Sequence, residues 1–381
     1  AWSGAALLGA PAVLRGRYRL FGAQGPAYSA RAVRLVEDSL VIDMLNQFRF
    51  ADFAQRPPLS ARWLQRAGAF GEADWETYRT SGIDVFALGH GVNTYEEAIR
   101  YFADWNSFVA QYDQWFMRID DVRDLDRVRG SGRIGILLTF QNSDHFRTAQ
   151  DVDTFHALGQ RLSQLTYNYQ NRIGAGFLET SDSGLSVFGG EIVARMNAVG
   201  MAVDVSHCGD RTTMDAIAAS KKPVVFSHAS ARALAPDHLR CKTDEAIRGM
   251  ARSGGVMGIP FLRMMIRAEE PVTIDHVIDH FDHVVRLAGI EHVGVGSDMD
   301  IVGNPNPVNG EPMRETPNWD RYRLHKDDQG RWMLTIKGLD HPRRTFDLTE
   351  GLIRRGFSDA NIRLILGGNW RRVMSDIQAT A

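Results

Sequence analysis

Cysteine is scarce in this sequence. Its 381 residues include only two, which excludes a scaffold held by several disulfides and any cysteine-rich metal module. An excess of one charge is also lacking, because 44 Lys and Arg residues balance 46 Asp and Glu residues to a net charge of −2. This balance gives no general attraction to nucleic acid or anionic lipid. No apolar run reaches the roughly 20 residues of a membrane-spanning helix. We therefore expect no nucleic-acid partner and no transmembrane span.

The first 29 residues differ in composition from the rest. Residues 1–14 carry no charge and are rich in Ala, Gly and Leu, and arginines follow at 15, 17 and 19. The apolar length suits the core of an export signal, and residues 10–12 (A-P-A) have the small-residue pattern of a cleavage site. We expect residues 1–29 to be an export-signal remnant or a flexible amino-terminal segment, with a buried or membrane-peripheral helix as the alternative.

Eight short apolar runs predict strands that are buried on both faces, as in a parallel sheet. They cover residues 40–45, 83–88, 133–140, 161–167, 201–206, 223–227, 254–259 and 292–296. Helical patterns lie between them, such as residues 210–220 and 277–288. Eight βα units over roughly 350 residues favour an α/β fold, a single (β/α)₈ (TIM) barrel over residues 30–381.

A doubly wound open sheet is the alternative fold. No G-x-G-x-x-G or G-x-x-x-x-G-K-[ST] motif follows a predicted strand, which argues against its nucleotide-binding form. The stretch around residues 304–338 is polar and contains Pro and Trp, and we expect it to be an insertion after the eighth strand.

The candidate chemistry follows the predicted strands, because side chains at the carboxyl ends of barrel strands face the active site. Two strands end in Ser-His, at His207 and His228, and a pair of imidazoles from neighbouring strands suits Zn²⁺. Asp298 ends the eighth run, where a carboxylate could bind metal or accept a proton from water. Arg240 follows the sixth strand and could clamp a substrate carboxylate. Without partners, Asp298 would be a cap and Arg240 a solvated surface charge.

Several ordered motifs resemble the membrane (renal-type) dipeptidase family. They are V-D-V-S-H-C-G-D-R-T-T at 203–213, P-V-V-F-S-H-A-S-A-R-A-L at 223–234, H-V-G-V-G-S-D-M-D at 292–300 and R-R-G-F-S-D-A-N-I-R-L-I-L-G-G-N-W at 354–370. L-T-Y-N-Y-Q-N at 165–171 and S-D-S-G-L-S-V-F-G at 181–189 resemble an exported bacterial branch. The resemblance extends over residues 30–380 and implies a barrel of the metal-dependent hydrolase type.

The resemblance also implies a function and roles for the residues. The family consists of zinc enzymes that cleave dipeptides and related amides, so a small peptide or peptide-derived substrate is expected. His207 and His228 correspond to the two histidine ligands of one zinc ion. Asp298 corresponds to the catalytic Asp, and Arg240 to the Arg that holds the substrate carboxylate. Homodimers are common in the family, and the bacterial branch implies an exported, periplasmic protein.

Four positions depart from the family pattern. Leu45 and Gln47 stand where a His and an Asp bind the other zinc ion, and Gln141 stands where a Glu bridges both ions. Tyr167 replaces a substrate-side His. Since Leu cannot bind a metal and Gln lacks the charge of a carboxylate, we expect at most one zinc ion. Substitute ligands remain open, the candidates being Asp43, Asp144 and His145.

Three functions follow as hypotheses. The first is a dipeptidase-like metallohydrolase that uses one metal ion or is weakly active. The second is a non-hydrolytic, dipeptidase-like periplasmic protein that binds or helps to mature a peptide-derived compound such as a siderophore. The third is a structural barrel whose cleft contacts proteins. Cys208 and Cys241 follow His207 and Arg240 directly, and an exported chain could join them in a disulfide that pins the substrate-side loop.

Overall fold

The computed structural model describes residues 17–19, 27–48, 59–303, 325–326, 332–333 and 336–379. The expected export-signal segment falls almost entirely outside these ranges, as does most of the expected insertion at 304–338. Within the described ranges, no helix is long and apolar enough to cross a membrane.

Eight parallel strands form the centre of the fold, and each coincides with one predicted run. They are β3 (Ile42–Asn46), β4 (Val85–Leu88), β6 (Ile134–Phe140), β7 (Gln160–Gln164), β8 (Ala202–Asp204), β9 (Val224–Val225), β10 (Met257–Ile259) and β11 (Val293–Val295). Strands β3, β4, β6, β7, β8 and β9 pair in that order, and β10 pairs with β11. Isolated parallel bridges, Phe226 to Met257 and Asn46 to Met299, join the two groups. The strands thus close into a ring, which confirms the predicted barrel.

One strand of the main sheet was not predicted. β5 (Phe116–Arg118) pairs in parallel with the amino-terminal residues of β6, Ile134–Ile136. It has only three residues, so its sequence carries no periodicity that could be recognised. Four more short strands form two separate antiparallel pairs. β1 (Arg17–Arg19) pairs with β2 (Ala27–Ser29), and β12 (His325–Lys326) pairs with β13 (Trp332–Met333).

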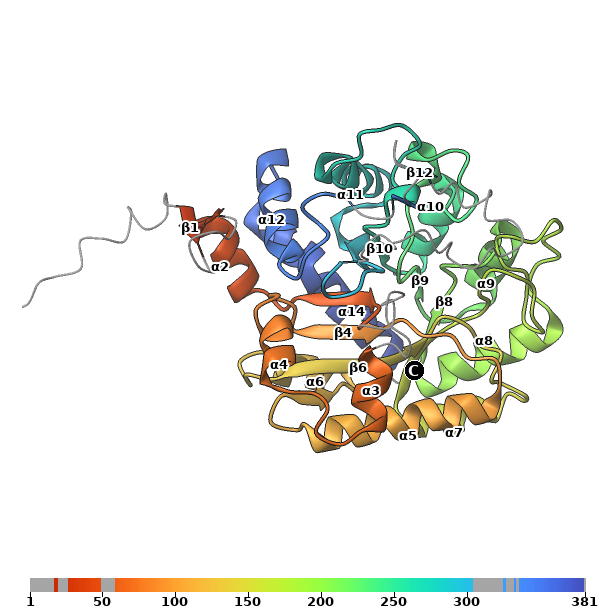
Figure 1. The fold of residues 1–381 in the computed structure, drawn as a ribbon. Helices are drawn as coiled ribbons and strands as arrows, with labels where there is room; N and C mark the ends of the chain where they lie inside the picture. Colours follow the sequence, from red (N-terminus) through yellow and green to blue (C-terminus); the bar gives the residue numbers. More distant parts are fainter. Residues whose placement is uncertain are drawn as a thin grey trace, which may run out of the picture.

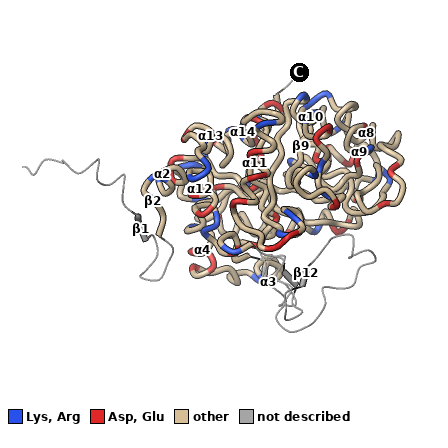
Figure 2. Tube along the Cα trace, turned by 90° about the horizontal axis from the view of Figure 1, so that it is seen from above, with Lys and Arg blue, Asp and Glu red and all other residues tan. Residues whose placement is uncertain are grey.

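Helices surround the strands (Figure 1). They are α2 (Ala30–Asp38), α3 (Leu59–Gln65), α4 (Glu72–Arg79), α5 (Tyr95–Gln111), α6 (Val122–Val128), α7 (Asp151–Leu158), α8 (Val187–Val199), α9 (Asp210–Ala219), α10 (Asp244–Arg252), α11 (Ile274–Ala288), α12 (Arg344–Arg355), α13 (Asp359–Arg363) and α14 (Asn369–Gln378). Side-chain caps define several starts. Thr94 and Thr243 accept the backbone N–H of Glu97 and Ala246. Lys/Arg and Asp/Glu alternate over the surface helices (Figure 2), in line with the small net charge.

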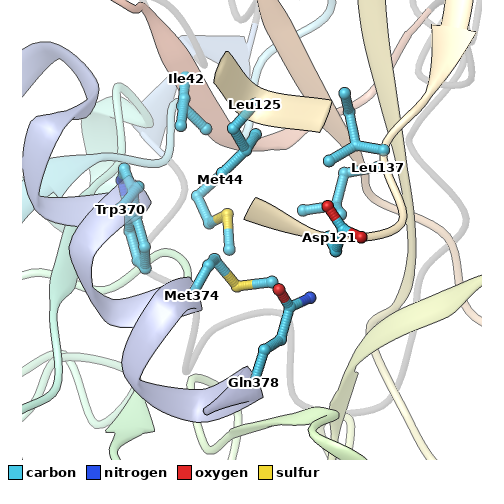
Figure 3. Close-up of a pocket in the computed structure, with 9 residues that line it drawn as sticks. Ile42, Met44, Asp121, Leu125, Leu137, Trp370, Met374 and Gln378 are labelled. Carbon is cyan, nitrogen blue, oxygen red and sulfur yellow. The ribbon is translucent and has the colours of Figure 1, made fainter. Parts of the chain in front are cut away.

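The barrel interior is apolar at its amino-terminal end. Alternate strand residues point inward, because successive side chains of a strand face opposite sides, and they form one cluster with α14. In Figure 3, Met44, Trp370 and Met374 lie around a small pocket at this end. The Trp370 indole donates to the Val295 carbonyl at 2.9 Å. Helix α14 therefore closes the amino-terminal end, and a site for substrate must lie at the carboxyl ends of the strands.

Candidate active site

Two imidazoles meet at the carboxyl ends of β8 and β9. The Nε2 atoms of His207 and His228 lie 3.1 Å apart. His228 is fully buried and His207 is 5% exposed. Burial and the nearby Arg240 charge hold the pKa of both imidazoles well below the ordinary value, so both are neutral near pH 7. The structure therefore brings together the two predicted histidines, in the protonation state that a metal ion requires.

Asp298 joins this cluster from the end of β11, which pairs with β10. It follows β11 in a left-handed conformation (φ 53°), and its N–H donates to the Leu45 carbonyl at 2.8 Å. Its Oδ2 lies 3.8 Å from Nε2 of His228, and its Oδ1 accepts the Gln47 amide at 2.5 Å. Burial raises the pKa of Asp298 to about 7, against the opposing effects of that hydrogen bond and of Arg240. The carboxyl group can therefore hold or release a proton near neutral pH.

Leu45, Gln47 and Gln141, the positions expected to depart from the family pattern, can be located in the structure. A Cβ atom built on Gly89, after β4, would lie 2.9 Å from the Gln141 amide nitrogen and 3.2 Å from Cγ of Leu45. Leu45 is fully buried and Gln141 is 6% exposed. Leu45 and Gln141 thus place apolar carbon and a neutral amide next to Gly89, while the Gln47 amide donates a hydrogen bond to one oxygen of Asp298.

Two buried cations lie behind the histidines. The Arg240 guanidinium donates to the carbonyls of Ser206 and His228, the latter at 2.9 Å. Lys242 donates to the carbonyls of Val205 and Cys208 and to the Thr213 hydroxyl, at 2.7 to 3.0 Å. Burial lowers the pKa of Lys242 to about 8. The predicted Arg240 is therefore close to the site, but two of its contacts stabilise the backbone that carries the histidines.

Tyr167 covers one side of the pair. Its ring stacks on the His207 imidazole, with centroids 4.3 Å apart and 22° between the planes. The side chain is 43% exposed, so it can also contact a ligand that enters from solvent. The Oδ1 atom of the neighbouring Asn168 lies 2.7 Å from Nδ1 of His207.

A buried carboxylate at the end of β8 was missed by the sequence analysis. Asp204 accepts hydrogen bonds from the N–H groups and hydroxyls of Ser206 and Ser227, the serines that precede the two histidines. The only signal in the sequence was an Asp within an otherwise apolar run, two residues before Ser-His. Lys242 and Asn168 were missed as well, since isolated polar residues on loops carry no pattern.

The three candidate substitute ligands are engaged elsewhere. Asp43 accepts the N–H and hydroxyl of Ser297 and the Asn46 amide. Asp144 accepts the Asn142 amide at 2.6 Å. His145 bonds to the Gln160 side chain and packs among the rings of Phe140, Phe146 and Phe155. Each of the three thus has hydrogen-bond partners other than the histidine pair.

The predicted disulfide is wrong for this structure, because both cysteines are free and buried. The Cys208 sulfur accepts the Thr166 hydroxyl at 3.3 Å, whereas the Cys241 thiol lies 3.6 Å from the Met265 carbonyl, to which it donates. The two sulfurs thus point to different neighbours. Burial raises the pKa of both thiols, so neither is a reactive thiolate.

The spacing of the two imidazoles can be compared with that of zinc ligands. Two nitrogens bound tetrahedrally to one zinc ion lie about 3.3 Å apart, from Zn–N distances of about 2.0–2.1 Å. The observed 3.1 Å between the two Nε2 atoms is close to that value. Among the described residues, no three His, Cys, Asp or Glu side chains form a group that could hold a metal ion. His207 and His228 are thus spaced as two ligands of one zinc ion would be.

Comparison with known proteins gives a consistent result. The model of the membrane dipeptidase family (Peptidase family M19) matches residues 34–310. An uncharacterized dipeptidase of Schizosaccharomyces pombe is 37% identical over 179 residues, 45% of this chain and 43% of that protein. Dipeptidase verJ of Clonostachys rogersoniana is 33% identical over 252 residues, 65% of this chain and 56% of that protein. The matched parts thus span about half the length of these curated relatives.

The fold has a counterpart among solved structures. An amidohydrolase from Pseudomonas aeruginosa superposes with a TM-score of 0.75 at 28% sequence identity, covering 91% of this chain and 99% of that one. The barrel architecture is therefore shared along almost the whole length of that protein.

Proposed function

Because this chain belongs to the membrane dipeptidase family, we propose that it is a metallohydrolase that cleaves the amide bond of a dipeptide or related small peptide with one zinc ion. The observation that carries the proposal is the convergence of two neutral imidazoles, 3.1 Å apart, beside a carboxyl group with a pKa near 7. A structural barrel would have no need for this arrangement, since burying these polar groups opposes folding.

His207 and His228 would hold the ion through their Nε2 atoms. When bound, zinc lowers the pKa of water and polarises a carbonyl group. Asp298 would transfer the proton. With a pKa of about 7, its carboxylate accepts a proton from the attacking water and returns it to the leaving amine.

The substrate would lie between the two remaining predicted residues. The Arg240 charge, beside both imidazoles, attracts the terminal carboxylate of a peptide. The exposed face of Tyr167 offers an apolar surface for a substrate side chain. A dipeptide carries both features, a carboxylate and a side chain next to the scissile amide.

The experiment is zinc content per chain by mass spectrometry, after saturation and removal of excess metal, together with hydrolysis of a dipeptide panel. We expect about one zinc ion per chain, lost in the His207→Ala variant. The control is His283→Ala, which removes a histidine that pairs with Asp244 away from the site. Two ions per chain would contradict the single-metal proposal, and no bound zinc would refute hydrolysis by this route.

A second candidate function is binding of a peptide-derived compound without hydrolysis. It is favoured by one contact, the Gln47 amide on Oδ1 of Asp298, where the family pattern has a metal-binding Asp. This hydrogen bond occupies an oxygen of the proton-transferring group. Stoichiometric zinc with no hydrolysis of any dipeptide in the panel would support this candidate over the first.

A further inference from the structure

We propose that Asp204 is a positioning residue that sets the tautomer of His228 through Ser227, and so keeps the lone pair of Nε2 available for zinc. The inference rests on the proposed metal-binding role of His228. It concerns a residue that contacts neither imidazole and acts through a relay of two hydrogen bonds.

Four hydrogen-bond donors surround the Asp204 carboxyl group. Its side chain is fully buried. Oδ1 accepts the Ser206 N–H at 2.8 Å, the Ser206 hydroxyl at 2.6 Å and the Ser227 N–H at 3.2 Å. Oδ2 accepts the Ser227 hydroxyl. Burial raises the pKa of Asp204, and the four hydrogen bonds oppose this effect by stabilising the charged form. Two of the four donors are backbone N–H groups, which cannot accept a proton in return.

The direction of the relay follows from the donors available. A serine hydroxyl carries one hydrogen, and that of Ser227 points to Asp204. Its oxygen is therefore an acceptor toward Nδ1 of His228, 2.9 Å away. When Asp204 is ionised, the imidazole therefore carries its proton on Nδ1, which leaves Nε2 with a free lone pair. That atom is the one that faces His207 at 3.1 Å.

His207 is not fixed in the same way. Its Nδ1 faces the side-chain amide of Asn168, which can present either its oxygen or its nitrogen after rotation. In the metal-free protein, His207 can therefore donate its Nε2 hydrogen to His228, and rotation of Asn168 would release the lone pair when zinc arrives. Asp204 makes His228 the fixed ligand of the pair.

The Asp204→Asn substitution reverses the relay. The position of Oδ1 receives two backbone N–H groups, so the amide must place its oxygen there. Its NH₂ group then faces the Ser227 oxygen and donates to it. The Ser227 hydroxyl turns to donate to Nδ1 of His228, and the imidazole proton moves to Nε2. The Nε2 lone pair needed for zinc is lost, although the substitution only exchanges a carboxylate for an amide of nearly the same shape.

The test is ¹⁵N NMR of selectively labelled histidines in the metal-free full chain, paired with zinc affinity by chelator competition. The native protein should show His228 protonated on Nδ1, and Asp204→Asn should show it protonated on Nε2. Zinc affinity should fall by about 10- to 100-fold, as for other residues that orient a metal-binding histidine. The matched control is Asp43→Asn, which alters the buried carboxylate that holds Ser297, before Asp298. It should leave the His228 tautomer unchanged.

Ser227→Ala keeps the test decisive if Asp204→Asn does not fold. It removes the acceptor of the His228 Nδ1 hydrogen and should weaken zinc binding more than Ser206→Ala, which leaves that hydrogen bond in place. An Nδ1-protonated His228 in Asp204→Asn, or equal zinc affinity in the two serine variants, would overturn the inference. Because the tautomer is measured without metal, failure of the native chain to bind zinc would refute the proposed function separately.

Discussion

The Asp298→Asn variant should be more stable than the native protein at alkaline pH when no metal is present. Burial raises the pKa of Asp298 from 3.8 to about 7, so the folded state binds a proton more tightly than the unfolded state. A carboxyl group of this kind stabilises the fold at low pH and loses that contribution as the pH rises from 3.8 to about 7. At about 1.36 kcal/mol per pKa unit, the full loss is about 4 kcal/mol.

Asn is a suitable neutral reference at this position. It keeps the oxygen that accepts the Gln47 amide, and it tolerates the left-handed backbone conformation of residue 298. The stability gain of the variant over the native chain should be about 2 kcal/mol at pH 5 and about 4 kcal/mol at pH 8. Urea titrations of both metal-free proteins at the two pH values measure it. A gain that does not change with pH would refute the electrostatic reasoning. The variant should also lose hydrolysis, since no group would then accept the proton.

Three further predictions follow from other contacts. Lys242→Met should lower the free energy of unfolding by about 3 kcal/mol, because three buried acceptors lose their donor; an unchanged urea midpoint would contradict this. A Cβ at Gly296 would lie 1.8 Å from the Ser227 carbonyl, so Gly296→Ala should cost at least about 1–3 kcal/mol and reduce zinc binding. Gly190→Ala, which meets nothing within 4 Å, is its control, and equal stability of the two variants would argue against it. The triple substitution Leu45→His, Gln47→Asp and Gln141→Glu, which restores the family ligands, should raise the zinc content to two ions per chain. A content of one ion would show that the second site needs more than these three side chains.

The barrel could be predicted from sequence because its strands are buried on both faces and read as uninterrupted apolar runs. The same property places residues: His207 and His228 follow two such runs directly, and the structure brings them within 3.1 Å. The spacing of residues in the sequence does not give the order of the strands or the closure of the barrel, which bring Asp298 to the site. Asp298 lies near the histidine pair because β10 is bridged to β9 and pairs with β11. Its N–H meets the Leu45 carbonyl where β11 returns beside β3.

The supporting residues could not be predicted, because their contacts depend on side-chain direction. Arg240 was assigned to a substrate carboxylate, yet its guanidinium also donates to two main-chain carbonyls of the site. Cys208 and Cys241 lie on neighbouring loops, as expected, but their thiols bond to different partners. Asp204 lay within a predicted strand, where a single carboxylate is indistinguishable from a tolerated polar residue.

The closure of the barrel has a consequence for its motions. Three main-chain hydrogen bonds join the pair β10–β11 to β9, and two join it to β3, around the bridges at Phe226 and Asn46. His228 lies two residues after the bridge residue Phe226, on the β10 side of this pair. Asp298 lies one residue before the bridge residue Met299, on the β11 side. Segments joined by few ladder hydrogen bonds open at lower free energy than the global transition. Native-state hydrogen exchange should therefore find the amides along these two joints among the first to exchange, and a ligand held by both His228 and Asp298 would protect them together.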